Sequence, residues 1–140
     1  MTEVLFHFNV PEKLGYACRL LRKAYGSGAR VGVVGDGPTL QALDKELWSF
    51  SALDFVPHCG AAAKPHMLAA SPVVLSTDCA RVPHAQVLLH LGDEVPPGFE
   101  RFERLIEIVS EDDVDRARAR VRWRHYADRG YALRRHDAKR

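Results

Sequence analysis

The residues with the most distinctive chemistry are the arginines in the last part of the chain. From position 116 onward the sequence contains nine arginines and one lysine, against the acids Asp128 and Asp137. Arg116, Arg120 and Arg124 follow one another at intervals of four, which places their side chains on one face of a helix. Aligned guanidinium groups repel one another by about a few tenths of a kcal/mol per pair, so such a row favours an anionic partner.

The same helix, expected over Glu111–Arg129, leaves other interpretations open. Trp123 and Ala127 lie one step around from the arginine row, and Arg118 and Arg122 flank it. Acidic residues at the helix start could balance the arginines and also suit the helix dipole: Glu111, Asp112, Asp113 and Asp115. The spacing therefore establishes only a shared face. That face could bind an acidic protein segment, bind single-stranded nucleic acid directly, or remain solvated.

Other residue types that carry chemistry lack the required spacing. The turn Gly35–Pro38 follows an apolar run, but it lacks the third glycine of a dinucleotide fingerprint and the Gly-Lys-Ser/Thr of a P-loop. A nucleotide-binding α/β enzyme that uses this turn remains an alternative function. Metal-ligand types occur without a CxxC or HxxxH pair, at His58, Cys59, His66 and Cys79. With no Ser-His-Asp arrangement either, we expect no catalytic site, no metal and no cofactor.

An aromatic segment follows the second helical stretch. Trp48 ends that stretch, and apolar residues follow within eight positions: Phe50, Leu53, Phe55 and Val56. One interpretation is core packing, because aromatic side chains near helix ends often cap a core. The other is an exposed patch, which would mark a partner site because Trp and Phe contribute much of the binding energy at interfaces.

Hydrophobic periodicity predicts the elements that position these residues. Apolar runs predict strands at Glu3–Val10, Arg30–Val34, Pro72–Ser76, Ala85–Leu91 and Leu105–Val109. Stripes at steps of three and four predict helices at Leu14–Tyr25, Thr39–Trp48 and Glu111–Arg129. Residues 57–71 are expected to form an irregular loop. The order predicts an α/β, Rossmann-like three-layer fold with a mainly parallel central sheet flanked by helices.

Composition is that of one globular domain over residues 1–140. The chain is 46% hydrophobic and its net charge is +2, so a protein that coats duplex DNA is not indicated. No apolar stretch reaches the roughly 18 residues of a membrane span, and no signal peptide is evident, so we expect a cytoplasmic protein. The three cysteines are expected to be free thiols.

Three motifs together resemble the DNA polymerase III chi subunit family over nearly the whole chain. The opening MTEVLFHFNV leads to a helix and then GARVGVV, which resembles the family's opening strand, helix and SGKRV-type strand. LDKELWSFSALDFVPH is similar to the family's LDxxLW followed, seven residues after the Trp, by FVPH. RARARVRWRHYADRGYAL resembles the family's basic and aromatic helix, which ends in glycine and an aromatic residue.

This resemblance implies a non-catalytic accessory subunit of the DNA-directed DNA polymerase holoenzyme, with catalysis in another subunit. It would bridge two proteins. One is the psi subunit, through which the chain would be linked to the clamp loader; the other is single-stranded-DNA-binding protein, bound by its acidic, Phe-ended C-terminal tail. DNA would therefore be contacted indirectly. By position, Trp48 and Phe55 would contact psi. The tail would be held by Arg116, Arg120, Trp123 and Arg124, with Val109 at the floor.

The chemistry of that tail site can be stated independently of the family. A tail with a terminal apolar ring, a free carboxylate and preceding aspartates needs an apolar socket rimmed by guanidinium groups, which donate two parallel hydrogen bonds to a carboxylate. Such a small contact predicts micromolar affinity and strong salt dependence. The chain departs from the family in carrying Arg where Lys is frequent. The last residues, from Asp137, are expected to form a flexible basic tail.

Overall fold

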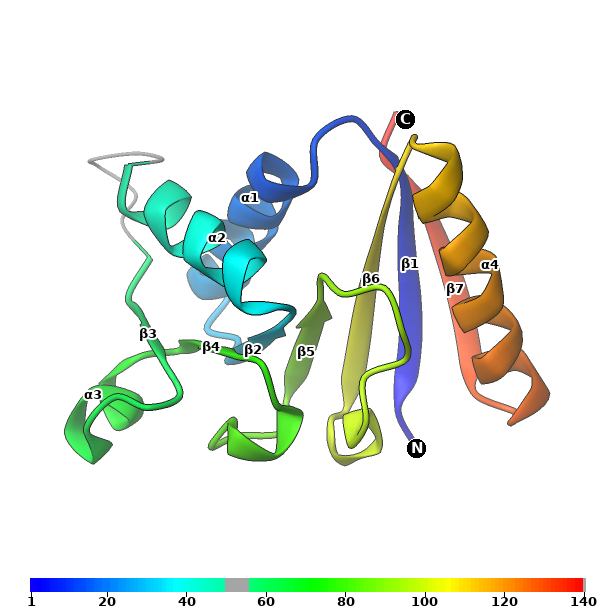
Figure 1. The fold of residues 1–140 in the computed structure, drawn as a ribbon. Helices are drawn as coiled ribbons and strands as arrows, with labels where there is room; N and C mark the ends of the chain where they lie inside the picture. Colours follow the sequence, from blue (N-terminus) through cyan, green and yellow to red (C-terminus); the bar gives the residue numbers. More distant parts are fainter. Residues whose placement is uncertain (50–55, 140) are drawn as a thin grey trace.

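The computed structural model describes residues 1–49 and 56–139, which form one sheet of seven strands (Figure 1). The strands are β1 (Glu3–Val10), β2 (Val31–Val34), β3 (His58–Gly60), β4 (Val73–Ser76), β5 (Val87–His90), β6 (Arg104–Ser110) and β7 (Ala132–Asp137). Their order is β3-β4-β2-β5-β6-β1-β7, and each neighbouring pair is parallel. The predicted α/β fold with a mainly parallel sheet is therefore confirmed.

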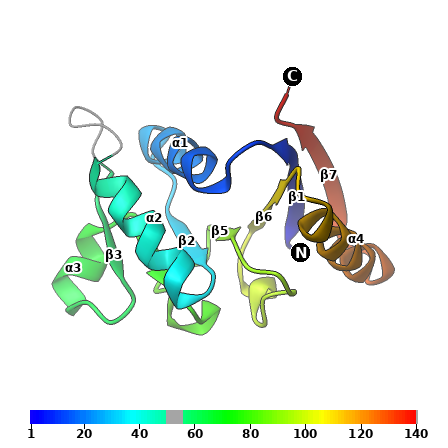
Figure 2. The same ribbon diagram turned by 45° about the horizontal axis from the view of Figure 1, so that its top comes forward.

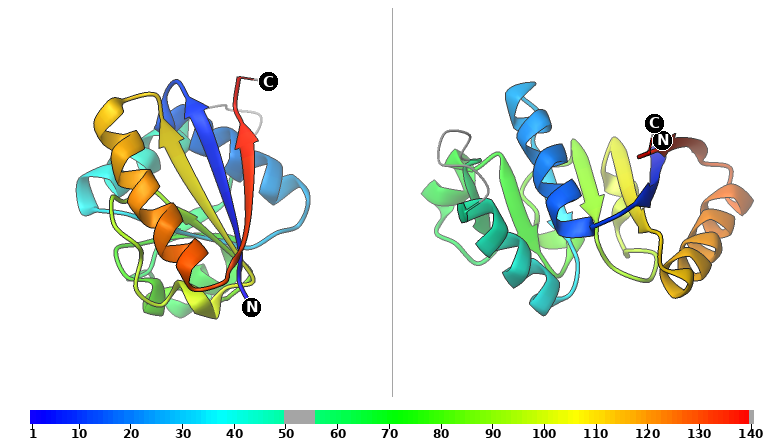
Figure 3. Two further views of the ribbon diagram at one scale, coloured as in Figure 1. Left: turned by 90° about the vertical axis from the view of Figure 1, so that its right-hand side faces the viewer. Right: turned by 90° about the horizontal axis from the view of Figure 1, so that it is seen from above.

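Helices lie on both faces of this sheet. They are α1 (Lys13–Gly26), α2 (Gly37–Ser49), α3 (Pro65–Ala70) and α4 (Asp113–Asp128), with short 3-10 helices η1 (Cys79–Arg81) and η2 (Phe99–Arg101). Apolar residues of α1 and α2 share one core cluster, whereas α4, η1 and η2 contribute to a second cluster on the other face (Figure 3). Figure 2 shows α2 beside β3 and β2, and α4 beside β6, β1 and β7.

Burial on both faces explains why the central strands are continuous apolar runs rather than alternating ones. All four residues of β2 and all four of β4 are buried. Gly32 in β2 faces the segment after η1, and a Cβ atom at this position would lie 2.7 Å from Val82 Cγ1. The glycine thus permits this segment to pack directly on the sheet.

The interpretation of residues 57–71 as an irregular loop is wrong. They contain β3, whose three residues pair with β4, and the six-residue helix α3. Neither element has a detectable hydrophobic period, because β3 is too short to alternate and no residue of α3 is buried. The structure here is set by backbone pairing at the sheet edge.

A seventh strand, β7, was not expected, and it changes the interpretation of the chain's last residues. It pairs in parallel with β1 over Ala132–Asp137. The Ala138 amide donates to the Phe8 carbonyl at 2.9 Å, and Lys139 Nζ lies 2.7 Å from a Glu111 carboxylate oxygen. The residues 137–139, at the start of the expected flexible tail, thus contact β1 and the segment before α4. No helix in the described part of the chain is long and apolar enough to cross a membrane.

Candidate functional site

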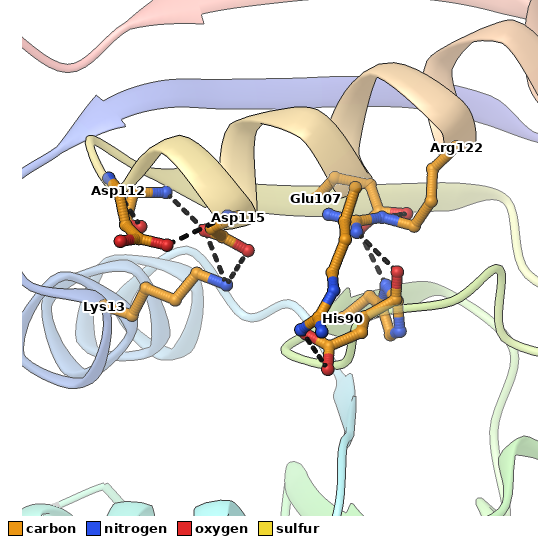
Figure 4. Close-up of polar contacts among 9 residues, drawn as sticks. Lys13, His90, Glu107, Asp112, Asp115 and Arg122 are labelled. Atoms are coloured by element: carbon orange, nitrogen blue, oxygen red, sulfur yellow. Dashed lines mark hydrogen bonds and ion pairs between the residues drawn. The ribbon is translucent and has the colours of Figure 1, made fainter.

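Two acidic side chains, each with a hydrogen-bonding or ionic partner, fix the N-terminal end of helix α4 (Figure 4). Asp112 caps it by accepting a hydrogen bond from the Asp115 amide at 3.0 Å. The Asp115 carboxylate accepts from the Ser110 amide at 2.8 Å and lies 3.0 Å from Lys13 Nζ of α1. Burial alone raises the pKa of Asp115, but these two partners outweigh it and hold the pKa below its usual range. The start of α4 is thereby fixed to the carboxyl end of β6.

A buried charged network fixes the middle of the same helix (Figure 4). Glu107 of β6, fully buried, accepts hydrogen bonds from Tyr126 at 2.6 Å and from His90 Nδ1 at 2.6 Å. Arg122, only 1% exposed, lies with its Nε 3.2 Å from Glu107 Oε2 and donates to the Asp93 carbonyl at 2.7 Å. Burial raises the pKa of Glu107, but the interactions with His90, Arg122 and Tyr126 outweigh it and lower the pKa.

This network corrects one expectation from the sequence. Arg122 was expected beside the exposed arginine row, but its side chain points into the protein and pairs with Glu107. Glu107 was not singled out at all, although a lone acid inside the apolar run LIEIV is a usable signal, because a fully buried carboxylate needs a partner. The pair anchors α4 to the sheet and so positions the outer face of the helix.

Between α4 and the carboxyl ends of β1 and β6 lies a groove of about 420 Å³, which we call the tail groove. Apolar side chains line it: Phe6, Phe8, Val109, Ala119 and Trp123. Polar groups complete the lining: Asn9, Ser110, Arg116, Arg120 and Arg135. Trp123 is held edge-on against Phe6 with ring centroids 5.1 Å apart, and the Arg135 guanidinium lies 6.0 Å from the Trp123 ring. The groove therefore combines apolar surface with three guanidinium groups.

The guanidinium groups in and beside the tail groove have no counter-charge within the part of the chain that the structure describes. Among the residues that the structure describes, Arg116, Arg120, Arg124 and Arg135 form no ion pair. Three of the acids that could have balanced them are engaged elsewhere: Glu111 with Lys139, Asp112 in the helix cap and Asp115 with Lys13. This weakens the interpretation of the row as a balanced, solvated face.

Four of the five residues expected at a tail site meet in this one groove. They are Val109, Arg116, Arg120 and Trp123. Arg124 is exposed one turn further along α4 and does not line the groove. Sequence reasoning missed Arg135, because its strand was not expected. It also missed Phe6 and Phe8, whose shared face follows from strand alternation.

The two residues expected at a psi interface differ in how far they can be placed. The Trp48 side chain, at the end of α2, is 63% exposed and lies edge-on to the His58 ring with centroids 5.4 Å apart. His58 in turn lies 3.0 Å from the Asp44 carboxylate of α2. Phe55 lies outside the described residues. Trp48 is thus a surface residue, and its interpretation as core is wrong.

The candidate nucleotide turn has a different role in the structure. Asp36 accepts a hydrogen bond from the Thr39 amide at 2.7 Å, so the turn caps the first turn of α2. A cavity of about 550 Å³ does lie at the carboxyl ends of β2 and β5, but four acids line it: Asp36, Asp78, Asp93 and Glu94. Carboxylates at this position repel phosphate groups, which disfavours the nucleotide-binding alternative.

The cysteine and histidine region was also considered as a metal site. In the described part of the chain no three His, Cys, Asp or Glu side chains are placed to hold a metal ion. Cys18, Cys59 and Cys79 are free and buried. Burial raises the pKa of the Cys18 and Cys79 thiols to about 11, so both are poor nucleophiles.

The fold and the groove define a class of protein: an α/β domain with an apolar groove rimmed by arginines, suited to hold an anionic group. Comparison with known proteins defines the family. Residues 1–134 match the family described as DNA polymerase III chi subunit, HolC, and the chain belongs to that family. The chi subunit is an accessory subunit of DNA polymerase III and acts in DNA replication, and catalysis lies in other subunits of the complex.

Individual relatives agree with the family assignment. The chain is 34% identical over 125 residues to the DNA polymerase III subunit chi of Pseudomonas aeruginosa, covering 89% of this chain and 85% of that protein. It is 29% identical over 122 residues to the subunit chi of Haemophilus influenzae, covering 84% and 81%. Among solved structures, the C-terminal domain of S. cerevisiae Dbp5, bound to Gle1 and IP6, matches with a TM-score of 0.59 at 12% identity, covering 98% of this chain and 90% of that one. That likeness concerns the fold alone.

Proposed function

We propose that this chain links two proteins of the replication machinery by binding the acidic C-terminal tail of single-stranded-DNA-binding protein in the tail groove and the psi subunit at the Trp48 surface. The observation that carries the proposal is the groove itself, where uncompensated arginines surround apolar side chains. Its place of action would be the bacterial cytoplasm, where the chromosome is replicated. DNA would be contacted indirectly, through the coating protein.

The chemistry of the groove matches the end of such a tail. An apolar ring can pack on Val109 and against Trp123, while Arg116 and Arg120 receive the terminal carboxylate. Both arginines are on α4 one turn apart, so their forks converge on the same part of the groove. A contact of this size supports micromolar affinity, and exposed ion pairs make it weaken as salt rises.

Fluorescence anisotropy with a labelled peptide ending in Asp-Asp-Ile-Pro-Phe tests the tail site. We expect saturable binding that is lost when the terminal Phe is deleted or its carboxylate is amidated. Arg120→Ala should weaken binding about tenfold or more, because a charge-assisted hydrogen bond contributes about 1.5–3 kcal/mol. Arg118→Ala is the matched control on the same helix, since Arg118 pairs with Asp93 outside the groove. Equal binding of the intact and amidated peptides would contradict recognition of the terminal carboxylate, and the binding would then be non-specific electrostatic attraction.

The psi contact has its own experiment. An exposed tryptophan is a typical binding hot spot, and Trp48 presents most of its ring to solvent. The Trp48→Ala, Phe55→Ala double variant should fail to co-purify with psi and keep the wild-type circular dichroism spectrum. If the double variant still associates with psi, these two residues are not the interface. If it does not fold, the two side chains are needed for the stability of the chain.

A further inference from the structure

A second hollow, of about 540 Å³, lies on the opposite face of β1 from the tail groove, between α1 and the edge strand β7. We call it the second groove. Its basic side chains come from three elements, α1, β6 and β7: Arg19, Lys23, Arg104, Arg134, Arg135 and His136. Figure 3 shows α1 and α4 on opposite sides of β1. Alternate residues of β1 line the two grooves, Phe6 and Phe8 the tail groove, Leu5 and His7 the second groove.

The second groove is strongly cationic. Glu3 is the one acid among its described lining residues, and it lies 3.6 Å from Arg104. Within the described part of the chain, Arg19, Lys23 and Arg134 form no ion pair. The buried His7 at this groove reports the same environment, because burial, His136 and Lys23 lower its pKa to about 4. Its Nε2 atom has no hydrogen-bond partner among the residues 1–49 and 56–139.

The two grooves are joined at the edge of the sheet. Arg135 lines both of them, while its neighbours Arg134 and His136 line only the second. β7 is the last strand of the sheet, so its outer N–H and C=O groups face no other strand among the described residues. A peptide that leaves the tail groove past Arg135 can therefore reach the second groove by crossing one strand, about 5 Å wide.

We propose that the second groove binds the acidic segment that precedes the terminal residues of the same tail, so that the partner's chain crosses the edge of β7 from one face to the other. This inference rests on the proposed function above, and it extends the contact beyond the end of the tail. An acidic peptide fits better than single-stranded nucleic acid, which uses free aromatic faces for base stacking. The aromatic ring here, Tyr16, is half-buried and lies under the Arg19 guanidinium at 5.8 Å.

The test compares two peptides by fluorescence anisotropy on the full chain: Asp-Asp-Ile-Pro-Phe, and the same sequence extended N-terminally by ten residues rich in aspartate. Exposed ion pairs are individually weak, so several new ones should tighten binding of the long peptide about tenfold at low salt. Arg19→Glu with Arg134→Glu should abolish that advantage and leave the short peptide unchanged, which also verifies the fold. Lys64→Glu with Arg81→Glu changes the net charge by the same amount at two exposed residues that line neither groove, so it is the charge-matched control and should have little effect on either peptide.

The outcomes separate this inference from the proposed function. If the wild-type chain binds the two peptides with equal affinity, the proposed role of the second groove is wrong, while the proposed role of the tail groove still stands. If neither peptide binds, both proposals fail together. If the double variant loses binding to an oligo(dT) strand but still prefers the long peptide, the groove is a nucleic-acid site and the inference is wrong.

Discussion

The buried pair between Glu107 and Arg122 gives the sharpest prediction about stability. Glu107→Gln keeps the side-chain volume, so it creates no cavity, but it leaves the Arg122 guanidinium buried with no counter-charge. Arg122 is only 1% exposed and Glu107 is fully buried, so water cannot compensate. Removing one partner of such a pair costs about 3–5 kcal/mol, and we expect the lower end because Tyr126 can still donate to the amide oxygen.

Urea unfolding monitored by circular dichroism measures this loss, and at this chain length it corresponds to a fall in Tm of about 10 °C. Glu3→Gln is the control, because Glu3 also pairs with an arginine but both side chains are partly exposed. It should cost less than about 1 kcal/mol. A second variant, Glu107→Leu with Arg122→Met, should recover only part of the lost stability, because it removes both charges together but leaves Tyr126 and His90 without their acceptor.

The pH dependence of stability follows from the same residue. The folded protein lowers the pKa of Glu107, so its ionised form contributes stability above the ordinary pKa of 4.5, and this is lost as pH falls through the folded value. Glu107→Gln should remove that part of the acid sensitivity. If Glu107→Gln unfolds within about 1 kcal/mol of the wild type and keeps the same acid profile, the network does not anchor α4 as described.

Two further predictions concern the elements that position the groove. Asp115→Asn should destabilise the chain by about 1–2 kcal/mol at neutral pH, because Lys13 loses its counter-charge while the Ser110 hydrogen bond can persist. The stability difference between this variant and the wild type should shrink on acidification, because the folded protein lowers the pKa of Asp115 and the wild type loses that stability when Asp115 is protonated. Urea titrations of both proteins at neutral and acidic pH measure this difference. Gly32→Ala should lower the free energy of unfolding by about 1–3 kcal/mol, because the added methyl group overpacks against Val82. In thermal unfolding, adding Val82→Ala to the same chain should recover part of the lost Tm. An unchanged Tm for Gly32→Ala alone would contradict the packing described.

The central sheet and the long helices could be predicted from the sequence because they bury regular apolar patterns. The continuous runs at Val31–Val34 and Val73–Ser76 require cover on both faces, and this alone indicates a parallel α/β sheet. The interval of four between arginines likewise fixed a shared helix face. β3 and β7 were missed because both are edge strands held by backbone pairing. β3 has only three residues, too few to show a period, and no residue of β7 is buried.

The missed strand also explains what was missed at the site. Arg135 could not be assigned to the groove without β7, because nothing in its spacing relates it to Arg116 or Arg120 on α4. Arg122 was misplaced for a different reason: helical spacing puts it near the exposed row, and only the buried acid Glu107 reveals that it points inward. Its partner lies on another element, which periodicity within one helix does not detect.

The two tryptophans of the chain permit the most direct test of the central claim, that the tail groove holds the carboxyl end of an acidic peptide. Each indole N–H gives its own signal in a ¹⁵N-¹H correlation spectrum, and Trp48 lies on α2 while Trp123 lines the groove. Titration with Asp-Asp-Ile-Pro-Phe should shift the Trp123 indole signal to saturation and leave that of Trp48 in place. A Trp123 signal that stays unmoved at saturating peptide would contradict the account.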